Sequence, residues 1–405
     1  MSPSEEFVAE APVTSLEQGI VDGITGNGGH RGRTVLERED LDLLFAALAA
    51  RGFTIIGPTV RDDAIVYDEI TTSAELPIGW TDEQSRGGYR LRRRDDEALF
   101  GYAVGAHTWK RYLHPPRLML WRARRNVTGL DIVEQGQEHR PLALIGVRPC
   151  ELRAIEIQDR VFLGGPYVDP HYGERRRDVL VVAVNCTEPG GTCFCASMDA
   201  GPTAREGFDI ALTEVIGKRR HFFAVEAGSE RGEEICAELS ARLVLTAMSP
   251  AENEKVDARA ARAGRGMSRT VDTTDVSDLL ARNAENPRWA HAAERCLTCG
   301  NCTMVCPTCF CTTVEDLTDL AGDNAERWRR WDSCFTVDYS YIHGGSVRTS
   351  ARARYRHWIT HKFGTWLDQF GTSGCTGCGR CITWCPAGID ITEELHAVRQ
   401  TDVGG

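Results

Sequence analysis

Hydrophobic positions change their spacing partway along the chain, and this change predicts two differently built parts. In residues 35–51 apolar side chains recur at helical spacing and Gly52 follows them, which predicts a helix that ends there. A second helical pattern covers residues 151–162. Short apolar runs with the length of strands occupy residues 53–57, 64–70, 141–147, 178–185, 208–215 and 221–227. Strands that alternate with helices predict an α/β or α+β domain over residues 33–246.

The regions beyond this domain have a different pattern. Residues 1–32 end in the glycine-rich sequence GNGGHRGR, and we expect a mobile tail there. Residues 247–272 lose nearly all large apolar side chains, which is typical of a linker or an exposed connector. In residues 273–405 helix-like runs are broken by cysteines, and one of these runs covers 314–331. The pattern therefore predicts a second, helical domain over 273–405.

Length and charge exclude several classes of protein. A chain of 405 residues is long enough for two or three domains. Its formal charge of −11 argues against a nucleic-acid-binding protein, which is normally basic. No apolar stretch reaches the roughly 18–20 residues that span a bilayer, and the N-terminus lacks the pattern of a signal peptide. We therefore expect a cytoplasmic protein without a membrane span.

Sixteen cysteines in such a protein indicate metal or redox chemistry, because disulfides are disfavoured in the cytosol. Eight of them form two runs with the same spacing, in which two, two and three residues separate successive cysteines and a proline follows the last. The first run is Cys296, Cys299, Cys302 and Cys306, and the second is Cys375, Cys378, Cys381 and Cys385. This spacing is typical of ferredoxins that bind [4Fe–4S] clusters.

The geometry of such a run predicts which cysteines share a cluster. Three thiolates on a tight turn can each reach a different iron of one cube, whereas the fourth points away and usually reaches the partner cube. We therefore expect one cluster on Cys296, Cys299, Cys302 and Cys385, and the other on Cys375, Cys378, Cys381 and Cys306. Because each run would then supply one ligand to the cluster of the other run, cluster binding would be part of folding. A structural zinc site is the alternative, but it needs only four thiolates, typically in two separated pairs.

Four further cysteines predict a third [4Fe–4S] site in the first domain: Cys150, Cys186, Cys193 and Cys195. Cys150 and Cys186 follow predicted strand ends, where open α/β sheets place their ligands. The sequence NCTEPGGTCFC around the other two has the glycines and proline that allow the backbone to wrap closely around a cofactor. The alternative is that these cysteines are buried core thiols.

The remaining cysteines are harder to assign. Cys309, Cys311 and Cys334 are too few for a cube unless a group such as Asp332, or a thiol of the first domain, completes the set; packing beside a cluster is the simpler interpretation. Cys236 stands alone in a helical pattern and is expected to be a core thiol. A basic, aromatic stretch at 348–363 either offsets the negative charge of the clusters or forms an amphipathic helix face.

No catalytic residues are predicted, because the chain lacks the dinucleotide-binding, phosphate-binding, nucleophile-elbow and zinc-protease motifs.

A long segment separates the two cysteine runs. This arrangement resembles that of the α-helical ferredoxin modules of succinate dehydrogenase-type and heterodisulfide reductase-type electron carriers. We therefore expect a helical, ferredoxin-like domain with two clusters.

Six phrases together carry a more specific resemblance: RYLHPP, IGVRPCELRAI, VNCTEPGGTCFCASM, CLTCGNCTMVCPTCFC, RWDSC and GCTGCGRCITWCP. They resemble the β subunit of cytosolic NiFe hydrogenases of the NAD(P)-linked sulfhydrogenase type, a family that also includes the electron-transfer subunit of anaerobic sulfite reductase. The likeness covers roughly residues 35–400. Asp199 stands where the family would have glycine, which puts only the local turn in doubt.

The resemblance implies an electron-transfer subunit without an active site of its own. Its partners would be the large and small subunits of the NiFe hydrogenase, and an iron–sulfur subunit that binds flavin and NAD(P). A relay for sulfite reduction is the main alternative. An enzyme that binds its own flavin and a zinc-binding scaffold are two others, and absorbance and iron content would separate them.

Overall fold

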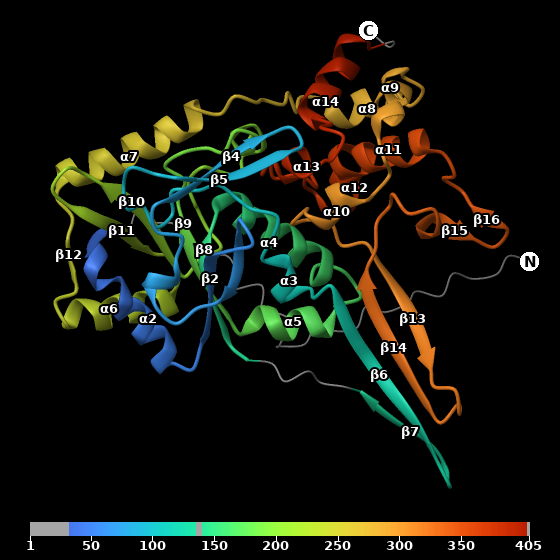
Figure 1. The fold of residues 1–405 in the computed structure, drawn as a ribbon, viewed down its shortest axis with the longest axis horizontal. Helices are drawn as coiled ribbons and strands as arrows, with labels where there is room; N and C mark the ends of the chain where they lie inside the picture. The colour runs from blue at the N-terminus through green and yellow to red at the C-terminus, as the bar shows by residue number, and fades with distance from the viewer. Residues whose placement is uncertain (1–31, 135–139, 403–405) are drawn as a thin grey trace, which may run out of the picture.

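The computed structural model describes residues 32–134 and 140–402, so the predicted tail at 1–32 lies outside the described residues except for Gly32. An eight-stranded mixed sheet forms the centre of the larger part (Figure 1). Its four inner strands are parallel, and the outer ones are antiparallel to their neighbours. The order is β12 (Leu245–Ala247), β1 (Thr34–Glu37), β11 (His221–Ala227), β10 (Ile210–Ile216), β9 (Val179–Val184), β8 (Leu142–Val147), β2 (Thr54–Arg61) and β3 (Ala64–Glu69).

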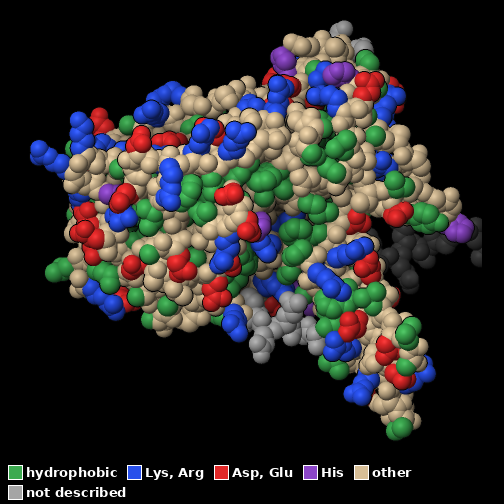
Figure 2. Space-filling view, viewed as in Figure 1, with side chains coloured by type: hydrophobic (Ala, Val, Ile, Leu, Met, Phe, Trp, Pro, Cys, Tyr) green, Lys and Arg blue, Asp and Glu red, His purple; other side chains and the backbone are tan. Residues whose placement is uncertain are grey.

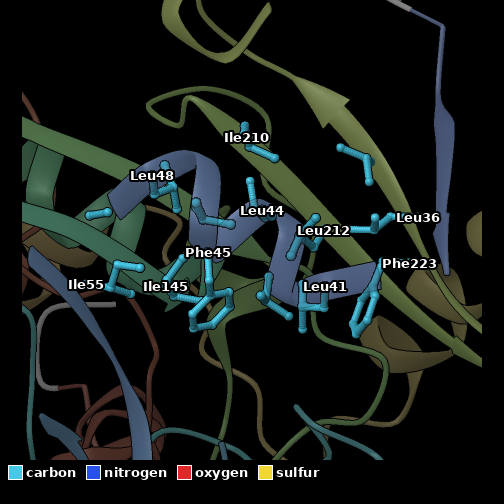
Figure 3. Close-up of a cluster of buried hydrophobic side chains, with 14 of the residues drawn as sticks. Leu36, Leu41, Leu44, Phe45, Leu48, Ile55, Ile145, Ile210, Leu212 and Phe223 are labelled. Atoms are coloured by element: carbon cyan, nitrogen blue, oxygen red, sulfur yellow. The ribbon is translucent and has the colours of Figure 1, made fainter. Parts of the chain in front are cut away.

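One face of this sheet is covered by two helices, α2 (Leu41–Ala50) and α6 (Glu230–Ala241). Leu44, Phe45 and Leu48 of α2 point onto apolar side chains of the strands (Figure 3). The helix predicted over 35–51 is shorter, because residues 34–37 form β1 and pair with β11 and β12, and a 3₁₀ turn (Arg38–Asp40) follows. Val35 and Leu36 then point to opposite faces, as neighbours in a strand must.

The other face is covered by α3 (Lys110–Leu113), α4 (Pro149–Phe162), α5 (Pro170–Arg177) and α7 (Pro250–Arg265). The last of these helices lies inside the segment predicted to be a linker. Its single large apolar side chain, Val256, is buried against Val215 and Phe222 of the sheet, and the rest of its buried face is alanine. The small size of that face explains why apolar periodicity missed the helix.

A smaller, mainly helical part contains both cysteine runs. Its core gathers Trp289, Tyr355, Trp358 and Phe363, which are all buried. The helices are α8 (Val276–Arg282), α9 (Arg288–Arg295), α10 (Asn301–Met304), α11 (Ala351–Thr360), the π-helical turn η5 (His361–Thr365), α12 (Trp366–Phe370), α13 (Arg380–Thr383) and α14 (Ile391–Gln400). No helix in residues 32–134 or 140–402 has the length and apolar composition to cross a membrane.

A four-stranded antiparallel sheet, which we call the arm, projects from the body (Figures 1 and 2). Its order is β13 (Thr312–Thr318), β14 (Asn324–Trp331), β6 (Arg117–Asn126) and β7 (Gly129–Glu134). The helix-like run predicted over 314–331 is therefore wrong: these residues form a hairpin. Pairing with β6 stabilises the strands, and the Arg117 guanidinium lies 4.0 Å from the ring centre of Trp328.

The two parts of the chain meet at a buried ion pair. Arg380 of α13 and Glu151 of α4 lie 2.5 Å apart with side chains 0% and 1% exposed. Tyr67 and Trp109 also donate hydrogen bonds to this carboxylate. A hairpin of β4 (Trp80–Ser85) and β5 (Gly88–Arg93) adds a second contact, since Gly87 at its turn donates to the carbonyl of Ile382. A small hairpin of β15 (Tyr341–Ile342) and β16 (Gly345–Ser346) completes the strands of the described residues.

The N-terminal cap of α7, the helix in the predicted linker, can be tested by measuring stability. The Ser249 hydroxyl accepts from the Glu252 amide, and the Glu252 carboxylate accepts from the Ser249 amide, so the pair forms a capping box. We expect Ser249→Ala to lower the free energy of unfolding by about 1 kcal/mol in chemical denaturation. Ser240→Ala, an exposed position within α6, is the control and should change it by less than about 0.5 kcal/mol. Equal effects of the two variants would contradict a stabilising cap at α7.

Candidate iron–sulfur centres

The two cysteine runs have the same backbone conformation. Left-handed φ angles occur at equivalent positions: 50° and 73° at Thr298 and Gly300, and 66° and 78° at Gly377 and Gly379. In each run the amide two residues after the first cysteine lies 3.4 Å from that cysteine's sulfur. A short helix, α10 or α13, begins after the second of these turns. Each loop therefore presents its first three thiols around one tight turn.

Cysteines from both runs surround one apolar cavity. Its lining includes Cys296, Cys299 and Cys302 of the first run, together with Cys385 and Cys381 of the second. Burial raises the pKa of the Cys302 thiol, and the neighbouring thiols of Cys296 and Cys385 raise it further. Aromatic side chains of Phe335, Tyr355 and Trp358 complete the wall. The structure thus brings together the four residues expected to hold the first cluster.

The second group contains the other four thiols of the two runs. Burial raises the pKa of the Cys381 thiol, and the nearby thiols of Cys375, Cys378 and Cys306 raise it further. Cys306 comes from the first run, so each run contributes its last cysteine to the other group. Cys302 also acts on Cys381, which places the two groups side by side.

A buried lysine lies against this second group. The Lys362 ammonium lies 3.3 Å from the sulfur of Cys306, and it donates to Thr308 Oγ1 and to the carbonyl of Gly374. Burial lowers the pKa of Lys362, but the thiols of Cys306, Cys309, Cys375 and Cys381 raise it well above its usual value. Lys362 lies in η5, and π-helical turns are frequent at functional sites.

The four cysteines of the larger part also lie together. β8 and β9 are parallel neighbours, so Cys150 and Cys186, which follow them, emerge at one edge of the sheet. Burial raises the pKa of the Cys195 thiol, and the charges of Cys193 and Cys186 raise it further. A buried guanidinium, that of Arg148, lies 4.0 Å from the Cys186 sulfur.

This third group contacts the second one directly. Cys150 and Cys195 pack with Cys378 in one buried cluster. The Phe194 amide donates to the carbonyl of Gly377 at 2.8 Å. A Cβ atom at Gly377 would lie 2.6 Å from the Cys195 backbone, and one at Gly379 would lie 2.5 Å from the Thr192 carbonyl oxygen. The close approach of residues 192–195 and 376–379 therefore requires glycine.

The residues of these groups fit [4Fe–4S] clusters. Thiols are the ligands that iron–sulfur clusters take. Three buried donor atoms beside them have no hydrogen-bond partner within the described part of the chain: Arg380 Nη1, Thr376 Oγ1 and Arg148 Nε. A buried donor without an acceptor is costly, and the sulfur atoms of a cluster would be acceptors for such groups.

The second TCFC sequence, residues 308–311, lies on another side of the second run. Thr308 Oγ1 donates to the carbonyl of Gly374, and the buried Lys110 ammonium donates to the carbonyl of Cys309. Asp332, one alternative ligand, instead uses Oδ1 to accept from the Ser333 amide and Thr336 Oγ1. Cys236 packs against the core of the larger sheet, as expected.

Sequence reasoning missed several residues of these sites. The basic stretch at 348–363 drew attention to Lys362, but nothing in its spacing marked that residue above its neighbours. Lys110 and Arg148 reach thiols that lie further along the chain, whereas Arg380 lies inside the second run and also interacts with Cys150 of the larger part. Only their position next to cysteine-rich or proline-rich phrases was visible in the sequence.

The region with both cysteine runs matches the family of 4Fe-4S dicluster domains over residues 295–389. The match defines an iron–sulfur protein with [4Fe–4S] clusters in its C-terminal part. The chain is also similar to the β subunit of sulfhydrogenase 2 from Pyrococcus furiosus, with 31% identity over 306 residues, 75% of this chain and 86% of the relative. It belongs to the family of sulfhydrogenase β subunits, and the resemblance inferred from the sequence is confirmed.

The glycine contact between the second and third groups can be tested by a matched pair of variants. Gly377 and Gly388 both have left-handed φ angles, 66° and 62°, so alanine costs each on the order of 1–2 kcal/mol. Only at Gly377 would the new Cβ overlap backbone atoms, whereas at Gly388 it meets nothing closer than 3.7 Å. We expect Gly377→Ala to lower the thermal unfolding midpoint clearly more than Gly388→Ala does. Equal losses would mean that the segments 192–195 and 376–379 are not held in contact.

Proposed function

We propose that this chain is an iron–sulfur electron-transfer subunit of a hydrogenase complex. It would carry electrons between a subunit that binds flavin and NAD(P) and the NiFe hydrogenase module. The observation that carries the proposal is that the second thiol group adjoins both of the others. The second group adjoins the first through Cys302 and Cys381, and the third through Cys378, Cys150 and Cys195. Three neighbouring redox centres in a row are what a relay needs.

We assign the ligands by these groups. The first cluster is held by Cys296, Cys299, Cys302 and Cys385, and the second by Cys375, Cys378, Cys381 and Cys306. The third, in the larger part, is held by Cys150, Cys186, Cys193 and Cys195. When bound, [4Fe–4S] clusters gain and lose single electrons, and the protein sets their potentials through charge, burial and hydrogen bonds to sulfur.

The chain's own residues supply buried positive charge beside the second and third sites. Lys362 donates toward Cys306 at the second, and Arg148 lies beside Cys186 at the third. Arg380 lies between the second and the third, and the thiols of Cys378 and Cys150 both act on its guanidinium. All three cations are buried, so solvent screens them little. We infer that they raise the potentials of the second and third clusters.

Iron content tests the number of clusters. At four irons per cube, the anaerobically purified chain should contain about twelve iron atoms and as much acid-labile sulfide. Cys150→Ser should lower the count to about eight, whereas Cys236→Ser, which changes a core thiol far from the runs, should leave it unchanged. A count of about eight iron atoms in the unaltered chain would mean that the chain holds the first two clusters and lacks the third.

The partners of the complex test the relay. Purification of the native complex followed by mass spectrometry should identify a flavin-binding subunit together with a nickel-bearing hydrogenase subunit. A siroheme-bearing partner in place of the nickel subunit would show that the chain serves sulfite reduction and not hydrogenase activity. A flavin absorbance band in the isolated chain would contradict the expectation that it has no active site of its own.

Lys362 gives a test of how the protein sets potentials. Lys362→Met should lower the midpoint potential of the second cluster by about 60 mV, because a charge-assisted hydrogen bond of about 1.4 kcal/mol corresponds to that shift for one electron. The measurement is a redox titration followed by electron paramagnetic resonance. Lys218→Met removes an exposed lysine and is the control for net charge. Identical potentials in both variants would contradict a hydrogen bond from Lys362 to the cluster's ligand.

A further inference from the structure

A cavity with a volume of about 690 Å³ opens between α7 and the turn that joins β10 to β11, and no cysteine lines it. The helix α7 lies against these two strands (Figure 1). Six of the twelve lining residues are basic: Lys218, Arg219, Arg220, Lys255, Arg259 and Arg262. Glu252 is the one acidic residue of the lining. In a chain with a formal charge of −11, such a concentration of positive charge needs a physical explanation.

Two elements bring these basic side chains to the cavity. Lys255, Arg259 and Arg262 follow one another at intervals of four and three residues, so they share one face of α7. The turn at 217–220 supplies the other three from the opposite side. Like charges four positions apart, as Lys255 and Arg259 are, destabilise a helix. A bound anion would remove this repulsion.

Most of this charge is not neutralised by the chain itself. Arg220 forms ion pairs with Glu37 and Glu252, so it is already compensated. Nη2 of Arg259 donates to the carbonyl of Ile216 at 2.6 Å, which positions the guanidinium but leaves its charge unpaired. Four other basic side chains of the lining have no ion-pair partner within the described part of the chain: Lys218, Arg219, Lys255 and Arg262.

The position and size of the cavity fit a small ligand. β10 is parallel to β9, so the carboxyl end of β10, where the cavity opens, lies at the same edge of the sheet as the carboxyl end of β9. Open α/β sheets bind their ligands outside this edge. Small-molecule sites have volumes of roughly 300–1,000 Å³, and this cavity falls within that range.

We propose that this cavity binds a small anion that carries two or more phosphate groups. A guanidinium matches the geometry of phosphate oxygens with two parallel hydrogen bonds, and an ammonium supplies a compact positive charge. Lys255 and Arg262 would contact the phosphates from α7, and Lys218 and Arg219 would contact them from the turn. A single phosphate would leave several of these cations unpaired, which is why the proposal specifies at least two.

The first test titrates inorganic pyrophosphate into the anaerobically purified full chain and measures binding by calorimetry. We expect saturable binding that weakens as the salt concentration rises, because salt screens exposed charges. A variant with both Lys255→Gln and Arg262→Gln should bind at least about tenfold more weakly, since it loses two charged hydrogen-bond donors. Arg265→Gln removes an exposed charge from the same helix but outside the cavity, and this control should bind as the unaltered chain does.

A chemical footprint gives a second measurement that needs no variant. The chain has four lysines, of which Lys110 and Lys362 are buried, whereas Lys218 and Lys255 are exposed and line the cavity. An amine-acetylating reagent should therefore label Lys218 and Lys255, both in the full chain and in its native complex. Pyrophosphate should slow the labelling of these two lysines, and mass spectrometry of the peptides would show it.

Three results would overturn the proposal. The first is the lack of saturable pyrophosphate binding, and the second is equal affinity in the double variant and the unaltered chain. The third is protection of Lys218 and Lys255 in the native complex before any pyrophosphate is added, because an acidic surface of a partner subunit would then cover the cavity. None of these measurements concerns iron content or redox potential, so the anion site can fail while the relay stands.

Discussion

The architecture depends on a backbone contact between two loops that each carry sulfur. Residues 192–195 of the larger part and residues 376–379 of the smaller one approach so closely that no Cβ fits at Gly377 or Gly379. The hydrogen bond from Phe194 to Gly377 joins the two loops, and the buried Arg380–Glu151 ion pair joins the helices α13 and α4 of the same two parts. A buried ion pair is weak evidence for stability, but breaking it leaves an unpaired charge, so it penalises any other arrangement of the two parts.

Buried positive charge makes the fold and the thiol sites interdependent. Lys110, Arg148, Lys362 and Arg380 all lie within the interior, and their neighbours include more thiols than carboxylates. A buried cation is expensive unless negative charge compensates it. Thiolates, with the clusters they bind, would supply that charge, so loading of the sites and packing of the interior would stabilise one another.

The predictable features were those encoded by short-range spacing. The strand ends at Cys150 and Cys186 followed from apolar runs, and the cysteine spacing predicted the two tight turns. For α7, apolar periodicity failed, although Ser249, Pro250 and Glu252 form a capping signal that was readable in the sequence. The arm was not predictable in this way, because β14 pairs with β6, some two hundred residues earlier in the chain. Pairing over that distance leaves no signal in the spacing of apolar residues, because a short run such as β14 can be read either as a strand or as a helix.

The two TCFC sequences show how far local identity goes. Thr192 and Thr308 are both fully buried, and each contacts the loop that carries the second run. The next element of the chain then separates them: a 3₁₀ turn begins at Cys195, whereas β13 begins directly after Cys311. The turn curls the first pair of cysteines toward Cys150, and the strand extends the second pair toward the residues after β14. Four identical residues thus enter different sites because the element that follows them, a 3₁₀ turn or the first strand of a hairpin, decides which part of the chain their cysteines approach.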